Sequence, residues 1–368
     1  MISLKVKEEI ILKIQDCLIG RTNNFTLMRF FAALAVLYGH SYALSLGIKK
    51  DGEDPISNFL IKIWGESLPS LSVDLFFVTS GFLVCASYIQ RANLVAFVEA
   101  RVLRIFPGMI VAMLFCIFCI GTFATTDSLS NYFLSPSTWS YFKHNTLLVT
   151  GIQFDLPGVF INNPYPISVN GSLWTLPVEL LMYFWVAVLG SLSLLKDEKT
   201  FNLFFIFLCL MYAQTTNNSF FILPEPRNAH LGLLFMLGAF LYINREKIIF
   251  GFPVLIALCV LVYLAKDYNF FLFVKSMCFA YSVLLLALHP RCQLPSIDRC
   301  GDISYGLYIY AFPVQQIIAH LIPQVKPINM FLLSMVITTI LAVLSWNLIE
   351  KPALKMKGNI ALFNKTSS

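Results

Sequence analysis

The sequence predicts an all-α membrane protein, a polytopic bundle of about ten transmembrane helices with both termini in the cytoplasm. Apolar residues make up 58% of the 368 residues, charged residues only 12%, and the mean hydropathy is +0.74. Two soluble domains of this total length would be far more polar. The net charge of +6 does not indicate a nucleic-acid partner, because membrane proteins collect lysine and arginine in cytoplasmic loops.

The amino-terminal segment, residues 1–26, is predicted to be a cytoplasmic amphipathic segment. Charged residues interrupt any signal-like apolar run. In KVKEEIILKIQDCLIG, one helical face carries Ile10, Ile11, Ile14 and Leu18. Such a face favours a short helix lying on the inner membrane surface.

The membrane-embedded domain is expected over residues 27–350. Runs long enough to cross a hydrocarbon core of about 30 Å occur at 27–46, 71–89, 105–125, 172–194, 201–222, 229–243, 250–265, 269–289, 303–321 and 328–348. With the amino terminus inside, most of the 26 lysines and arginines fall on the cytoplasmic side. Residues 351–368 then form a cytoplasmic basic tail.

The longest interruption, residues 126–171, is expected as an outer loop. It contains many amide and hydroxyl residues and the ring-bearing side chains Tyr132, Trp139, Tyr141, His144 and Tyr165. Aromatic and amide groups suit a sugar, so an outward glycan site is one interpretation. An interfacial aromatic belt is the other. The nine cysteines have neither disulfide nor metal-ligand spacing, and no metal is expected.

The first apolar run carries two costly residues, Arg29 and His40. They are 11 residues apart, which places them on one helical face about 16 Å apart along the axis. Ionisable groups inside a membrane helix indicate function by default. The alternatives are an arginine that reaches the lipid headgroups and a histidine bonded to a neighbouring helix.

Asp74 and Glu179 lie at a similar depth to His40. Counted from the inner ends of their helices, all three are roughly 20 Å up, in the outer half of the membrane. A carboxylate that orients an imidazole makes histidine a general base. Asp74 has an alternative role as a helix cap, and Glu179, just after Pro177, has one in complementing a helix dipole.

Arg101 and Arg104 precede the third run in EARVLRIFP. Three residues apart, they are neighbours on one helical face, and two guanidinium groups suit a grip on phosphates. Cytoplasmic membrane anchors are the alternative. A cationic inner mouth below His40 fits an elongated anionic donor that enters from the cytoplasm.

The ordered segments RFFAALAVLYGH, DLFFVTSGFL, ARVLRIFP, SLWTLPVELLMYF, SYGLYIYAFPVQQ and WNLIEKP resemble the acyltransferase-3 family of integral membrane O-acyltransferases. The resemblance runs from about residue 25 to 352. It implies a multi-pass enzyme of the bacterial inner membrane. It also implies an acyl-CoA donor, most often acetyl-CoA, and an acceptor hydroxyl on a glycan or lipid-linked glycan such as lipopolysaccharide.

The resemblance also implies roles for particular residues. His40 matches the essential catalytic histidine, with Glu179 in a proline-valine-glutamate stretch. Arg29, Arg101, Arg104, Ser80 and Gly81 match motifs expected on the donor side. Ala311 departs from the pattern, because many members have histidine there, and no role is carried over to it.

The function expected is therefore acyl transfer, with His40 as general base served by Asp74 or Glu179. One alternative is a transporter or flippase that uses these residues as a relay. Another is acyl transfer to an acceptor other than a glycan. The sequence identifies neither the acceptor hydroxyl nor the oligomeric state.

Overall fold

The computed structural model describes residues 12–18, 23–47, 54–149, 151–214, 225–295 and 301–358. Over these residues the chain is helical and forms no strand, only three isolated β-bridges. The all-α prediction is confirmed for this part of the chain. Ile10 and Ile11, half of the proposed amphipathic face, lie outside the described residues.

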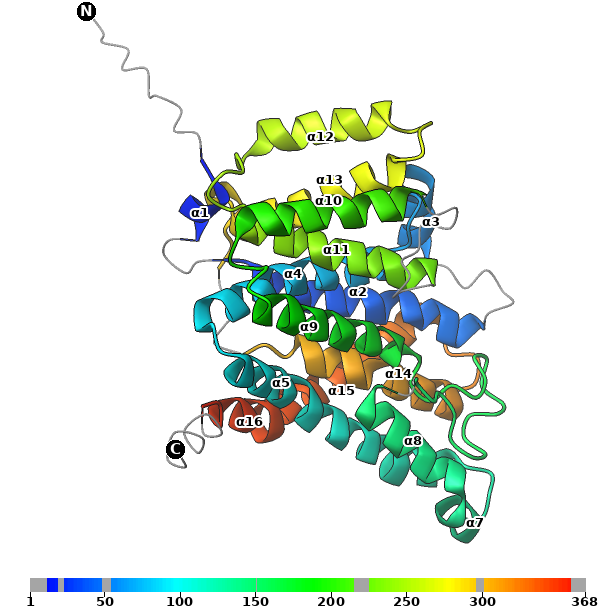
Figure 1. Ribbon diagram of the computed structural model, residues 1–368. Helices are drawn as coiled ribbons and strands as arrows, with labels where there is room; N and C mark the ends of the chain where they lie inside the picture. Colours follow the sequence, from blue (N-terminus) through cyan, green and yellow to red (C-terminus); the bar gives the residue numbers. More distant parts are fainter. Residues whose placement is uncertain are drawn as a thin grey trace, which may run out of the picture. The chain divides into compact units, whose positions relative to one another are not determined.

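The chain divides into two compact units, and the first consists of Met1–Phe25, Val78–Ala86 and Leu194–Ser296, as far as these are described. Its helices are α1 (Ile14–Cys17), α10 (Glu198–Gln214), α11 (Pro226–Ile243), α12 (Phe252–Leu264) and α13 (Phe271–Leu288). Helices α10 to α13 run side by side (Figure 1). The segment around α1 is fastened to the turn after α11, where Arg245 donates to Gln15 over 2.7 Å.

The second unit consists of Thr26–Phe77, Ser87–Ser193 and Ile297–Ser368, again as far as these are described. In it α14 packs along α15, and α5 packs against α8, α9 and α16 (Figure 1). Its helices are α2 (Phe25–Leu46), α3 (Pro55–Trp64), both ends of α4 (Leu68–Arg91), α5 (Leu94–Phe115), α6 (Thr122–Ala124), α7 (Leu129–Leu134), α8 (Pro136–Leu147), α9 (Leu176–Ser191), α14 (Ser304–Leu321), α15 (Pro327–Ser345) and α16 (Lys351–Lys355).

Among the described residues, six helical stretches are long and apolar enough to cross a membrane. They are Phe25–Leu46, Leu68–Arg91, Leu94–Ala124, Gly171–Ser191, Phe271–Leu288 and Pro327–Lys355. The other four predicted runs fall in α10, α11, α12 and α14. A multi-pass bundle is thus supported, while the count of ten spans and the cytoplasmic termini stay predictions.

Burial within the protein explains why α11 and α14 are less apolar than the six candidate spans. Nearly every side chain of α14 is buried, including Tyr305, Tyr308, Gln315 and Gln316. A helix surrounded by protein can carry glycine, tyrosine and glutamine, whereas a lipid-facing helix cannot. The opposite case is α12, which is strongly apolar and has no buried residue.

The region expected as an outer loop is built of short helices and turns, including α7 and α8. Tyr132 and Tyr141 are fully buried, and the Tyr132 hydroxyl donates to the carbonyl of Ile117 over 3.1 Å. These two tyrosines are core residues, so neither the glycan surface nor the interfacial belt describes them. Trp139 is 46% exposed and remains open to either role.

Candidate active site

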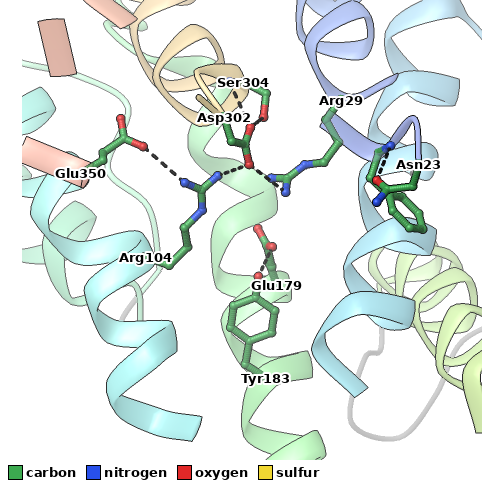
Figure 2. A network of polar contacts seen from close by, with 9 residues as sticks. Asn23, Arg29, Arg104, Glu179, Tyr183, Asp302, Ser304 and Glu350 are labelled. Carbon is green, nitrogen blue, oxygen red and sulfur yellow. Dashed lines mark hydrogen bonds and ion pairs between the residues drawn. The ribbon is translucent and has the colours of Figure 1, made fainter. Parts of the chain in front are cut away.

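In the second unit, the carboxylate of Asp302 pairs with two arginines from different helices (Figure 2). Its Oδ2 lies 2.6 Å from Arg104 Nη2 and 3.2 Å from Arg29 Nη1. Arg104 Nη1 also lies 3.6 Å from Oε2 of Glu350, which is 1% exposed. Two arginines therefore face two carboxylates, and the network is neutral.

Helix α14 positions Asp302. The backbone N–H and the hydroxyl of Ser304, the first residue of α14, both donate to Asp302 Oδ1, over 3.3 and 2.5 Å. Burial alone would raise the pKa of Asp302. The positive charges of Arg29 and Arg104 and the bonds from Ser304 outweigh burial, so the pKa lies well below its ordinary value.

A small cavity adjoins this network. Its polar wall consists of Arg29, Thr175, Glu179, Ser304, Tyr305 and Tyr308, and α4 supplies Val73, Phe76 and Phe77. Glu179 accepts a hydrogen bond from Tyr183, one turn along α9 (Figure 2). Glu179 therefore shares a cavity with Arg29, which the sequence placed at the inner mouth. The depth count, which placed Glu179 level with His40, assumed that the inner ends of the helices are level.

Arg101 has different surroundings from Arg104. Its guanidinium carbon lies 5.8 Å from the ring centre of Phe97 and 5.6 Å from that of Tyr183. It also borders an apolar groove between α5 and α9 that Val98 and Phe184 line. Within the described residues no carboxylate pairs with Arg101, and its buried Nε has no hydrogen-bond partner. The two arginines therefore differ in their partners, and a joint grip on phosphates stays a prediction.

His40 lies near residues 126–171, the predicted outer segment, to which Tyr165 belongs. Its ring is 5.4 Å from that of Phe312 on α14, and Phe312 is 5.8 Å from Tyr165. The adjacent turn of α2 is held by Gln315, whose amide donates to the carbonyl of Leu37 and to the Ser41 hydroxyl, over 2.8 and 2.7 Å. This places the imidazole in a defined position between α2 and α14.

The register of α2 against α4 places Asp74 relative to His40. Gly39 lies against Pro69, and Arg29 lies 5.8 Å from the ring centre of Phe76. Asp74 is five residues beyond Pro69, about 7 Å along the helix, so it lies nearer than His40 to the Arg29 end of α2. The capping alternative for Asp74 is wrong, because α4 begins at Leu68 and Ser67 caps it. The carboxylate that lies beside Gly39, the neighbour of His40, is buried Asp54, which caps α3.

Gly81 has a packing role in the first unit. A Cβ at Gly81 would lie against the backbone carbonyl of Phe235, and one at Gly238 against that of Val78. The two glycines let α4 and α11 approach closely. This explains the glycine of the serine-glycine-phenylalanine motif without a ligand. Ser80 is half-buried on the same helix.

Sequence reasoning missed Asp302, Glu350 and Asp54. Asp302 directly precedes the run 303–321, and Glu350 lies two residues after the run 328–348. In a chain with only 20 acidic residues, carboxylates at the ends of apolar runs are a usable signal. The sequence gives no signal for the arginines that pair with these carboxylates, because the partners lie up to 273 positions away in the chain.

Comparison with known proteins identifies the family of the chain. The model of the acyltransferase-3 family, described as an acyltransferase domain, matches residues 22–347. The chain belongs to this family and is a multi-pass membrane acyltransferase.

Two relatives resemble the chain over almost its whole length. An O-acetyl transferase of Shigella phage Sf6 is 28% identical over 346 residues, covering 90% of this chain and 96% of the relative. Nodulation protein 10 of Rhizobium leguminosarum bv. viciae is 28% identical over 378 residues, covering 93% and 95%. No solved structure matches the chain.

Proposed function

We propose that the protein is a membrane O-acetyltransferase of the bacterial inner membrane. It takes an acetyl group from cytoplasmic acetyl-CoA and transfers it to a hydroxyl of a cell-surface or exported polysaccharide. The observation that carries the proposal is the arrangement of α2. This helix has Arg29 in the polar cavity and His40, 11 residues further on, beside the outer segment. The similarity to the O-acetyl transferase of the phage supports the acetyl group and the hydroxyl acceptor.

The donor end is expected at the arginines. The positive charge of Arg101 is not matched by an ion pair among the described residues, so Arg101 suits the phosphates of CoA. Arg29 and Arg104 are already paired with Asp302. Arg29 lines the cavity through which the flexible arm of the donor is expected to pass towards His40, and Arg104 holds Asp302 next to Arg29.

The transfer step needs a base and an electrophile in contact. An imidazole nitrogen of His40 takes the hydroxyl proton while the oxygen attacks the thioester carbonyl. The tetrahedral intermediate then expels the thiolate of CoA, and the imidazolium returns the proton to that sulfur. An acyl-histidine route would give ping-pong kinetics instead.

A carboxylate is expected to orient the imidazole. The sequence pointed to Asp74 or Glu179, and the helix register adds Asp54 at the level of Gly39. Of the three, Asp54 lies at the level nearest to His40. Asp74 lies further towards the Arg29 end of α2, and Glu179 bonds to Tyr183 beside Arg29. Comparing Asp54→Asn, Asp74→Asn and Glu179→Gln identifies the partner as the variant whose kcat falls most.

The His40→Ala variant tests the function. We expect acetylation of the polysaccharide to fall at least 100-fold, because general-base catalysis contributes about that much or more. The measurement is mass spectrometry of surface polysaccharide, with the variant still present in the membrane. His320→Ala is the matched control, since His320 is exposed at the end of α14.

Two outcomes would contradict the proposal. Unchanged acetylation in His40→Ala would remove the assigned base. In vesicles with labelled acetyl-CoA and extracted polysaccharide, proton movement without label transfer would favour the transporter alternative. Label on a lipid or another small molecule would keep acyl transfer and change the acceptor.

A further inference from the structure

The positive charge of the second unit is distributed unevenly. Arg29 and Arg104 are balanced by Asp302 and Glu350. Arg101, however, faces the cations Arg91 and Arg104. Lys357 faces the same three arginines and one carboxylate, Glu99. Apart from Arg104, whose charge is balanced, the cluster consists of Arg91, Arg101, Lys357 and Glu99. Three cations against one carboxylate leave a net positive charge beside the neutral network.

The carboxyl-terminal turn is fastened to this place. The backbone N–H of Gly358 donates to both carboxylate oxygens of Glu99, over 3.1 Å each. Gly358 has φ +95°, a conformation that glycine adopts readily. Helix α16 packs on α5 just before this turn. The turn therefore holds Lys357 next to the helix that carries Arg101.

Two further observations favour an anion as the ligand of this cluster. Arg101 Nε is buried and has no hydrogen-bond partner. Partial loss of hydration and the charges of Arg101, Arg91 and Arg104 lower the pKa of Lys357 to about 8. Like charges held together in this way are stabilised by a bound phosphate.

We propose that Lys357 completes, with Arg91 and Arg101, a binding site for the nucleotide phosphates of the acyl-CoA donor. The turn at Gly358 is the element that closes the site. The inference rests on the proposed function for the identity of the donor. It makes part of the basic tail a donor-recognition element rather than a membrane anchor.

The kinetic test compares two donors that differ in the nucleotide. Purified protein in zwitterionic vesicles is assayed with acetyl-CoA and with S-acetylpantetheine, which has no nucleotide. In Lys357→Ala we expect KM for acetyl-CoA to rise roughly tenfold and kcat to stay within about twofold. The kcat/KM for S-acetylpantetheine should not change.

Matched variants separate charge from structure. Lys357→Arg should restore most of the affinity for acetyl-CoA. Lys355→Ala should behave as wild type, because Lys355 is an exposed tail lysine outside the cluster. An equal loss with both donors, or no loss with either, would overturn the proposal.

A binding measurement is independent of turnover. Calorimetry with CoA alone should give a Kd about tenfold weaker for Lys357→Ala than for wild type. If wild type binds CoA in this way but transfers no acetyl group, the proposed function fails while the site stands. A Lys357→Ala effect that needs anionic phosphatidylglycerol and is the same for both donors would indicate a lipid headgroup, and would overturn the nucleotide site.

Discussion

Arg104 and Arg101 are three residues apart on one helix and lie in opposite electrostatic settings. Arg104 pairs with Asp302 and with nearly inaccessible Glu350. Arg101 lies on two aromatic rings beside other cations. A buried charge with its counter-charges holds helices together, whereas a charge without one has capacity for a ligand. The comparison teaches that a paired-arginine motif can divide its work between structure and binding.

The largest effect is expected from Arg104→Ala. The change leaves Glu350 buried without its arginine and Asp302 with Arg29 alone. We expect a loss of about 3–5 kcal/mol in stability, the usual result of removing one partner of a buried pair. Thermal unfolding of the purified protein measures it.

Arg104→Lys should recover part of that stability, since lysine keeps the charge but loses the forked geometry. Asp127→Ala, which changes an exposed aspartate, should unfold like wild type. An Arg104→Ala protein that is as stable as wild type and has only a raised KM would show that Arg104 binds the donor and is not structural, which would contradict the division of roles between Arg104 and Arg101.

Arg101→Gln should have the complementary effect. KM for acetyl-CoA should rise about tenfold or more, because a charge-assisted contact to phosphate is lost. The unfolding temperature should change little, since the contacts of Arg101 with Phe97 and Tyr183 contribute only about 1 kcal/mol. Initial rates and thermal unfolding of one preparation test both statements. A large fall in stability would place Arg101 in the structural network after all.

The smallest effect is expected in the pH dependence of donor binding. Protonated Lys357 binds phosphate, and its pKa is about 8. Affinity for acetyl-CoA should therefore be full near pH 7 and decline a fewfold as the pH rises to 9. The charged groups that face Lys357 are Glu99, Arg91, Arg101 and Arg104, and the arginines keep their charge throughout.

The matched variant for this profile is Lys357→Arg. Its KM for acetyl-CoA should not vary between pH 7 and 9, because arginine does not titrate there. An identical pH dependence in wild type and in Lys357→Arg would assign the titration to another group.

Much of the fold could be predicted because lipid constrains sequence strongly. A lipid-facing helix must be apolar, so α2, α4, α5, α13 and α15 are visible as apolar runs. Helix α14 is visible less clearly, because its neighbours are protein. The two helices α7 and α8 were missed since short polar helices have no strong period.

Of the candidate site, the sequence indicated the ionisable residues and not their pairing. His40, Asp74, Glu179 and the arginines stand out because each is costly in a membrane helix. Glu179 lines the same cavity as Arg29, and counting residues from the predicted helix ends did not reveal this. Asp302 was missed because its partners come from α2 and α5.

By itself the sequence determined the class of protein: an α-helical membrane acyltransferase with an arginine and a histidine on one helix. Hydropathy and motif order are properties of the linear chain, so they can be read from the sequence without the fold. Only the tertiary structure decided that Asp302 and Glu350 together balance the charges of Arg29 and Arg104, and that Lys357 faces Arg101. Those outcomes depend on the distances between charges on different helices, and electrostatic energy follows distance in space rather than position in sequence.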